Sequence, residues 1–260
     1  MKTLRLVSGY VSHNLMSAMA YRGAFLLQAV GMILNNAMLL FFWWVLFTQL
    51  PSLRGWTLSQ VMVLYAIVAF GYGLANIVCG NAFLLARIVV RGDLDYSLAL
   101  PADPLIHVLV SRMSLSAWGD VVFGLAVFLI ADAEAGRHLP LFLLLGVLSG
   151  LIIVAFAVLV GSLAFWVGNA DNLAGQAINS LITFGMYPIE IFPGAVQWLL
   201  YTLIPAAFIG SMPAALLRDF RWDQLALLIL AAGGLVLLAR IVFQWGLRRY
   251  ESGNLVIVRG

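Results

Sequence analysis

The chain has 260 residues, of which 63% are hydrophobic and only 10% are charged, and its mean hydropathy is +1.03. This composition excludes a soluble globular domain and predicts an all-α integral membrane protein. The formal net charge of +3 is too small and too scattered to form a nucleic-acid surface, so we expect no nucleic-acid partner.

Six apolar runs are long enough, or nearly so, to cross roughly 30 Å of hydrocarbon as helices. In chain order they cover about residues 23–47, 58–85, 113–131, 139–167, 173–187 and 225–247. A turn around Pro51 and Gly55 separates the first two, and the polar segment 132–138 makes the third and fourth a hairpin. The fifth run is barely long enough. Together the runs predict six transmembrane helices.

The stretch that follows the fifth run is both apolar and rich in proline, with Pro188, Pro193, Pro205 and Pro213. Proline removes a backbone donor and blocks helix continuation, so one straight span fits this stretch poorly. We predict short re-entrant external helices over residues 188–217, between spans five and six.

The basic residues indicate how the spans are oriented. Six spans place both termini on one side, together with nine basic residues, and leave four on the other side. The nine are Lys2, Arg5, Arg22, Arg87, Arg91, Arg112, Arg248, Arg249 and Arg259, and the four are Arg54, Arg137, Arg218 and Arg221. The positive-inside rule therefore predicts a multi-pass protein of the cell (inner) membrane with both termini in the cytoplasm.

Three ionisable residues fall at or near membrane depth, where charge is costly and often functional. Asp120 and Glu190 are our candidates for a translocation path. Each also has a structural interpretation: Asp120 can pair with Arg112 near the cytoplasmic boundary, and Glu190 can be an interfacial carboxylate. Arg240 in the last span can extend its side chain toward the cytoplasmic headgroups.

The sequence contains no recognisable catalytic constellation. Its three histidines are far apart and form no metal-binding motif with cysteine or glutamate, so we expect no metal site. A nucleotide-binding P-loop is excluded because Lys2 is the only lysine and no glycine-rich segment precedes it. We therefore expect a protein that is not an enzyme by itself and carries no cofactor.

The link over residues 86–112 is the longest candidate cytoplasmic segment. Arg87 and Arg91 lie one helical turn apart, Gly92 can end that turn, and Asp93 can begin a second helix that Pro101 must stop. This pattern predicts a helix, a break and a helix on the membrane surface, in contact with a soluble partner. A purely structural bend is the alternative.

The same link carries a family resemblance. The run from Gly92 to Pro101, followed by Pro104-Leu105, Ser111-Arg112 and Gly119-Asp120, resembles the segment after the second span of ABC-2-type permeases, the membrane subunits of ATP-binding-cassette transporters. The ending Gly246–Gly253 also resembles one branch of that family. With the six spans and the broken apolar region before the last of them, the likeness covers nearly the whole chain.

This resemblance implies a single permease domain over residues 1–260 that dimerises, with itself or with a sister permease, and binds two copies of a separate ATPase that holds ATP and Mg. Residues 1–22 would form an interfacial helix on the membrane lipid, residues 86–112 the coupling segment, and residues 188–217 the external helices that close the exit. The coupling residues would be Arg87, Arg91, Gly92, Asp93, Leu94, Asp95, Pro101 and Pro104.

The resulting hypothesis is an exporter permease that moves an amphipathic or hydrophobic solute, such as a drug, an antibiotic or a lipid-like molecule. One rival is a self-sufficient secondary transporter or channel, for which only Asp120 is a fair ion-coupling residue. A second rival is a membrane-embedded lipid enzyme, which needs convergent catalytic groups that we do not find.

Overall fold

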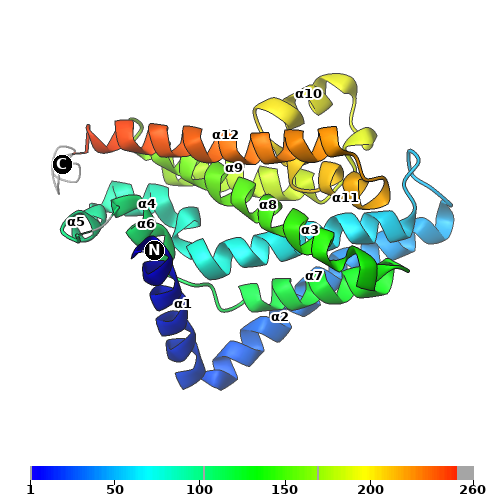
Figure 1. Cartoon of the computed structure of the whole chain (residues 1–260), viewed down its shortest axis with the longest axis horizontal. Coiled ribbons are helices and arrows are strands. Elements are labelled where there is room, and N and C mark those ends of the chain that lie inside the picture. Colours follow the sequence, from blue (N-terminus) through cyan, green and yellow to red (C-terminus); the bar gives the residue numbers. More distant parts are fainter. Residues whose placement is uncertain (1, 102, 169, 251–260) are drawn as a thin grey trace.

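The protein is a bundle of helices, as the composition predicted. The computed structural model describes residues 2–101, 103–168 and 170–250, is 82% helical, and contains no strands among those residues (Figure 1). Arg259 and the last three residues of the ending Gly246–Gly253 lie outside the described part. An isolated bridge between Leu53 and Trp56 closes the turn between the first two long helices.

Four helical stretches are long and apolar enough to cross a membrane. They are α2 (Arg22–Gln49), α3 (Leu58–Cys79) continued by η1 (Gly80–Leu84) and α4 (Leu85–Arg91), α8 (Ala135–Gly161) continued by η2 (Ser162–Phe165), and α12 (Trp222–Leu247). A fifth crossing is possible if α10 (Gly194–Thr202) and the segment Ala206–Arg218, bent by 75° to each other, count as one span. The latter segment holds η4 (Ala206–Phe208) and α11 (Ser211–Arg218).

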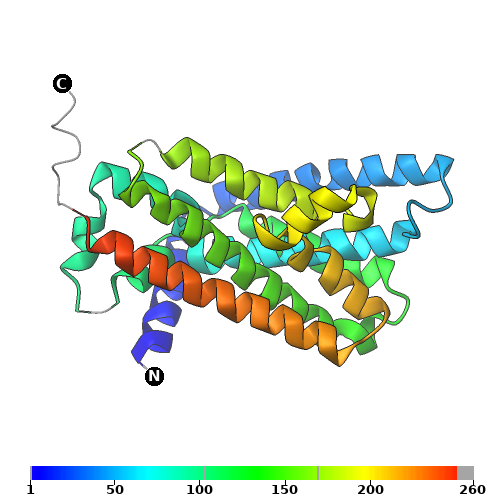
Figure 2. The same cartoon turned by 90° about the horizontal axis from the view of Figure 1, so that it is seen from above.

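Two of the predicted spans are shorter helices that lie along the long ones. α7 (Ala117–Ala131) packs against α3 and α2, and α9 (Ala170–Gly185) packs against α8 (Figure 2). With 15 and 16 residues they fall just below the usual 17 to 25 residues of a transmembrane helix. The run predicted from residue 113 loses its first turn because Ser114 donates its N–H to the Asn76 carbonyl instead of joining a helix.

Small residues bring the central helices together. A Cβ atom on Gly71 of α3 would lie 2.9 Å from the Gly146 carbonyl oxygen and 3.0 Å from the Gly150 nitrogen, both on α8. In lipid, helices do not associate to escape water, so such close backbone approach is a main source of packing energy. The result is a protein-buried centre: 78% of the most apolar stretch of α3 is buried, against 11% for α2 and 22% for α12.

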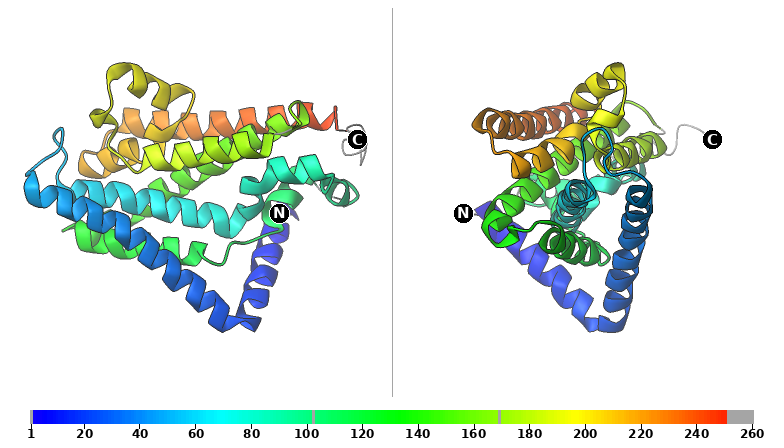
Figure 3. Two further views of the ribbon diagram at one scale, coloured as in Figure 1. Left: turned by 180° about the vertical axis from the view of Figure 1, so that it is seen from behind. Right: turned by 90° about the vertical axis from the view of Figure 1, so that its right-hand side faces the viewer.

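The short helices gather at the two ends of the bundle. α4, α5 (Leu94–Leu98) and α6 (Pro104–Val110) lie at the end where α12 finishes, and α1 (Lys2–Ala20) runs across the long axis of the bundle there (Figures 1 and 3). η3 (Ile189–Ile191), α10 and α11 lie toward the opposite end, and α11 borders the turn that joins α7 to α8.

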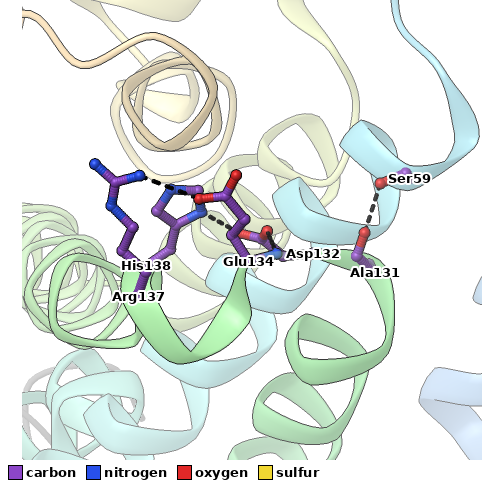
Figure 4. A network of polar contacts seen from close by, with 6 residues as sticks. All are labelled: Ser59, Ala131, Asp132, Glu134, Arg137 and His138. Carbon is purple, nitrogen blue, oxygen red and sulfur yellow. Dashed lines mark hydrogen bonds and ion pairs between the residues drawn. The ribbon is translucent and has the colours of Figure 1, made fainter.

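The polar turn predicted over residues 132–138 is present and joins α7 to α8. Asp132 accepts a hydrogen bond from the Glu134 N–H and lies 2.7 Å from Nδ1 of His138, and Arg137 pairs with Glu134 at 3.3 Å (Figure 4). Ser59 at the start of α3 donates to the Ala131 carbonyl at 2.6 Å. These contacts hold the α7–α8 turn against the beginning of α3.

Candidate coupling segment and translocation surface

The 86–112 segment folds as its sequence predicted, with a helix, a break and a helix. α4 ends at Arg91, and Gly92 takes a left-handed φ of +78°, which glycine adopts without steric cost. α5 follows directly, and the chain then turns into α6. There Asp103 accepts hydrogen bonds from the N–H groups of Leu105 and Ile106, and Pro104 fills the first helical position.

The residues predicted for coupling occupy different environments within this segment. Leu94 is completely buried and anchors α5 against the bundle. Four of the residues are exposed, namely Arg87, Arg91, Asp93 and Pro101, and Asp95 is half-buried. The neighbouring Tyr96 and Leu98 add exposed apolar surface. The segment therefore has one anchored face and one open face of mixed charge.

Two ion pairs connect this segment to distant helices. Arg87 of α4 pairs with Asp171 in the first turn of α9 at 3.0 Å, and Arg240 of α12 pairs with Asp103 at 2.9 Å. The guanidinium of Arg240 thus has a carboxylate partner, but its side chain is still 55% exposed, so its extension toward lipid headgroups stays a prediction. Both pairs are partly exposed, so each contributes less than about 1 kcal/mol to stability, but together they connect α4 to α9 and the start of α6 to α12.

Aromatic residues make further connections at the same end. The Tyr10 hydroxyl of α1 lies 3.1 Å from Nδ1 of His107 in α6, with the two rings edge to face. Burial and the nearby Asp95 carboxylate raise the pKa of Tyr250, just after α12, to about 12. The 86–112 segment is thus in contact with the first, ninth and twelfth helices.

Asp120 lies at the centre of a buried polar network. Its Oδ1 accepts a hydrogen bond of 2.6 Å from the Asn36 amide of α2, and the Tyr65 hydroxyl of α3 donates to Asn36 Oδ1 at 2.7 Å. Asp120 is only 3% exposed and its Oδ2 has no hydrogen-bond partner. The ion pair predicted with Arg112 does not form, because Asp120 points between α2 and α3 instead. Its role in a translocation path stays a prediction.

Glu190 lies in an exposed position on η3, toward the opposite end of the bundle. It accepts a 2.8 Å hydrogen bond from the indole N–H of Trp56, and the Arg218 guanidinium lies 5.7 Å from the centre of the same indole. This stack of acid, aromatic ring and base favours the interfacial interpretation of Glu190. A role in the translocation path stays a prediction here too.

The structure also reveals a polar surface that sequence reasoning missed. One face of α9 carries four exposed uncharged polar side chains, which we name the α9 stripe: Asn172, Gln176, Asn179 and Thr183. None of the four side chains has a hydrogen-bond partner in the described part of the chain, and three of them line a shallow cavity of about 300 Å³. The other face is apolar and buried against α8.

A sequence signal for the stripe was present. The four residues follow one another at spacings of four, three and four, which is the period of one helical face. Amides and hydroxyls are costly against hydrocarbon. On a helix that crosses a membrane, such a face would favour a protein or solute neighbour over lipid. α9 lies at the edge of the bundle on the same side as α2, where such a neighbour has access (Figures 2 and 3).

Comparison with known proteins gives one result. The family model described as "ABC-2 family transporter protein" matches residues 33–253, which include the 86–112 segment, Asp120, the α9 stripe and Glu190. No match was found among curated proteins or among solved structures.

Proposed function

The chain belongs to the ABC-2 transporter family, and on this premise we propose that it is the transmembrane permease subunit of an ATP-driven exporter. Such proteins are generally non-enzymatic membrane subunits that associate with an ATP-binding partner. In this proposal the partner ATPase holds ATP and Mg, and the permease moves an amphipathic or hydrophobic solute outward. Two permeases, identical or sister chains, form the translocation path between them.

In this arrangement α7 and α9 complete a set of six spans with α2, α3–α4, α8 and α12. α1 is the interfacial helix at the cytoplasmic face of the cell membrane, and η3, α10, η4 and α11 are the re-entrant external helices. Both termini are cytoplasmic. Short spans are tolerated because the bilayer thins locally and because α7 and α9 pack against longer neighbours.

The observation that carries the proposal is the contact between the 86–112 segment and α9. Arg87, in the proposed coupling segment, pairs with Asp171, and Asp171 directly precedes Asn172 of the α9 stripe. A displacement of the coupling segment by the ATPase therefore reaches the polar face of α9 through one ion pair. Uncharged amides and hydroxyls on that face suit the polar groups of an amphipathic solute.

The partnership is tested by purifying the full chain in mild detergent. We expect an ATP-binding-cassette ATPase to copurify in a fixed ratio. A self-sufficient secondary transporter or channel, with Asp120 as ion-coupling group, is the alternative. Reproducible recovery of the chain alone, with transport in proteoliposomes that lack ATP, would establish that alternative.

The coupling assignment has a sharper test in the variant Asp93→Lys with Asp95→Lys. We expect ATP hydrolysis to continue while transport is lost, since the open face of α5 changes sign. A matched control, Glu134→Lys with Asp219→Lys, makes the same charge change at exposed positions of the opposite end and should transport normally. Undiminished transport by the first variant would disprove the coupling role of α5.

A further inference from the structure

A cavity of about 350 Å³ lies between α1 and the 86–112 segment. Its walls come from α1, η1, α4, α5 and α6, so it is bounded by the proposed interfacial helix on one side and the proposed coupling segment on the other. The polar and charged residues in its lining include Tyr10, Arg87, Arg91, Asp93, His107 and Arg112.

The lining of this cavity has an excess of positive charge. Three guanidinium groups face one lining carboxylate, Asp93, and Arg87 is already paired with Asp171 outside the lining. Arg91 and Arg112 are exposed and have no hydrogen-bond or ion-pair partner in the described part of the chain. The guanidinium groups of Arg91 and Arg112 therefore line the same cavity and are available to bind an anion.

A second cavity, of about 250 Å³, adjoins the first. Both are lined by Ser111 and Arg112. The second continues along α1 past the polar side chains of Asn14, Ser17 and Tyr21 and the apolar side chains of Ala18, Met113 and Leu115. The combined space is positive at one end and uncharged, with more apolar than polar surface, at the other. An acidic peptide would place polar backbone along the less polar part. A phospholipid instead carries a phosphate for the positive end and acyl chains for the less polar end.

We propose that this cavity binds the phosphate of an anionic phospholipid headgroup from the cytoplasmic leaflet, with Arg91 and Arg112 as its ligands. The inference rests on the proposed function only in assuming that this end of the bundle is cytoplasmic. The guanidinium fork matches two phosphate oxygens at once, and basic pockets on the cytoplasmic side of membrane helices are suited to acidic headgroups. α1, which runs across the bundle, is well placed to lie at headgroup depth (Figure 1).

A bound lipid would connect α1 to α4 and to residue 112 by way of its phosphate. Because α4 also carries the ion pair to α9, the lipid would hold the proposed coupling segment at a fixed height relative to the membrane surface. The membrane would thereby help to hold the coupling segment in place when the ATPase pushes on it.

The test is a titration of the purified full chain, without ATPase, in neutral detergent micelles. Phosphatidylglycerol is added in increasing amounts and the melting temperature is followed, with phosphatidylcholine and inorganic phosphate as separate arms. We expect a saturable rise with phosphatidylglycerol only. Arg91→Gln with Arg112→Gln should shift the midpoint about a hundredfold toward higher lipid, since two charge-assisted hydrogen bonds are lost.

Two further variants keep the result interpretable. Arg248→Gln with Arg249→Gln removes the same charge from exposed positions at the same end, outside both cavities, and should change the midpoint far less. Asp93→Asn removes the lining carboxylate and should strengthen binding, a gain that no folding defect can produce. Equal loss in the two arginine pairs, no gain in Asp93→Asn, or the same rise with inorganic phosphate alone would each overturn the proposal. Because the ATPase is absent, this outcome is independent of the copurification result.

Discussion

The helices α3 and α9 belong to the same bundle but differ in how much of their surface the bundle covers. α3 is enclosed by α2, α7 and α8, and its glycines touch neighbouring backbone. α9 packs one face against α8, and its four exposed polar side chains form no hydrogen bond with any other residue that the structure describes. α3 therefore holds the protomer together, whereas α9 presents groups for something outside it. The two helices separate stability from function, and each prediction below tests that separation.

The largest loss of stability is expected from Gly71→Val on α3. The new side chain meets the Gly146 and Gly150 backbone and Ser149 Oγ, which forces α3 and α8 apart. Such overpacking costs about 3 kcal/mol or more, and we expect little folded protein in size-exclusion chromatography. The matched change Gly175→Val on α9 meets nothing within 4 Å and should fold normally. Misfolding of both variants would contradict the claim that α3 is closely packed at Gly71 and α9 is open at Gly175.

A smaller loss is expected from Asn36→Leu. It leaves the buried Asp120 without its hydrogen-bond donor and the Tyr65 hydroxyl with only the longer bond to the backbone carbonyl of residue 36, which costs about 2 kcal/mol in the free energy of unfolding. Chemical denaturation in detergent measures this value. Tyr65→Phe removes one donor only and should cost about 1 kcal/mol. If Asn36→Leu were neutral, the network would not be part of the stable core.

Next comes the ion pair between Asp103 and Arg240. Asp103→Ala removes both this pair and the N-cap of α6, and should lower the free energy of unfolding by about 1 to 2 kcal/mol. Arg240→Gln removes the pair alone and should cost less than about 1 kcal/mol, because both side chains are partly exposed. Thermal melting of the two variants separates the cap from the pair, and equal losses would contradict this division.

The smallest effect on stability, and a large effect on transport, is expected for the α9 stripe. Gln176→Leu with Asn179→Leu should leave the free energy of unfolding within about 0.5 kcal/mol, since neither side chain has a partner. Transport of the solute should fall roughly fivefold or more with the loss of two hydrogen-bonding groups. The control Leu173→Ala, also exposed on α9, should retain transport. Normal transport by the double variant would remove the stripe from the proposed path.

The sequence sufficed for the features that depend on local pattern. The long apolar helices follow from run length, the α7–α8 hairpin from its polar turn, and the break at Gly92 from the only residue there that takes a positive φ cheaply. The family also followed, because the residues from Gly92 to Asp120 and the order of apolar runs resemble it, and the family model matches residues 33–253. The span count was less secure, since length alone does not decide whether α7, α9 and the bent segment each cross the membrane.

The side-chain partners depended on tertiary structure and were predicted poorly. Asp120 is nearer in sequence to Arg112 than to Asn36, but α2 brings the amide to it across 84 positions. Arg240 reaches Asp103 across 137 positions, which no local spacing reveals. The α9 stripe was missed for a different reason: overall apolarity marked residues 173–187 as a span and drew attention away from the polar period inside it.

The α9 stripe has an evolutionary consequence. Its four side chains are exposed and make no hydrogen bond within the described residues, so natural selection can exchange them for other residues with little loss of folded protein. Under the proposed function, the cargo of such a permease would then change by a few substitutions, while α3 and its glycine contacts stay constrained. A lineage that keeps one scaffold and varies this one face would diversify its substrates quickly.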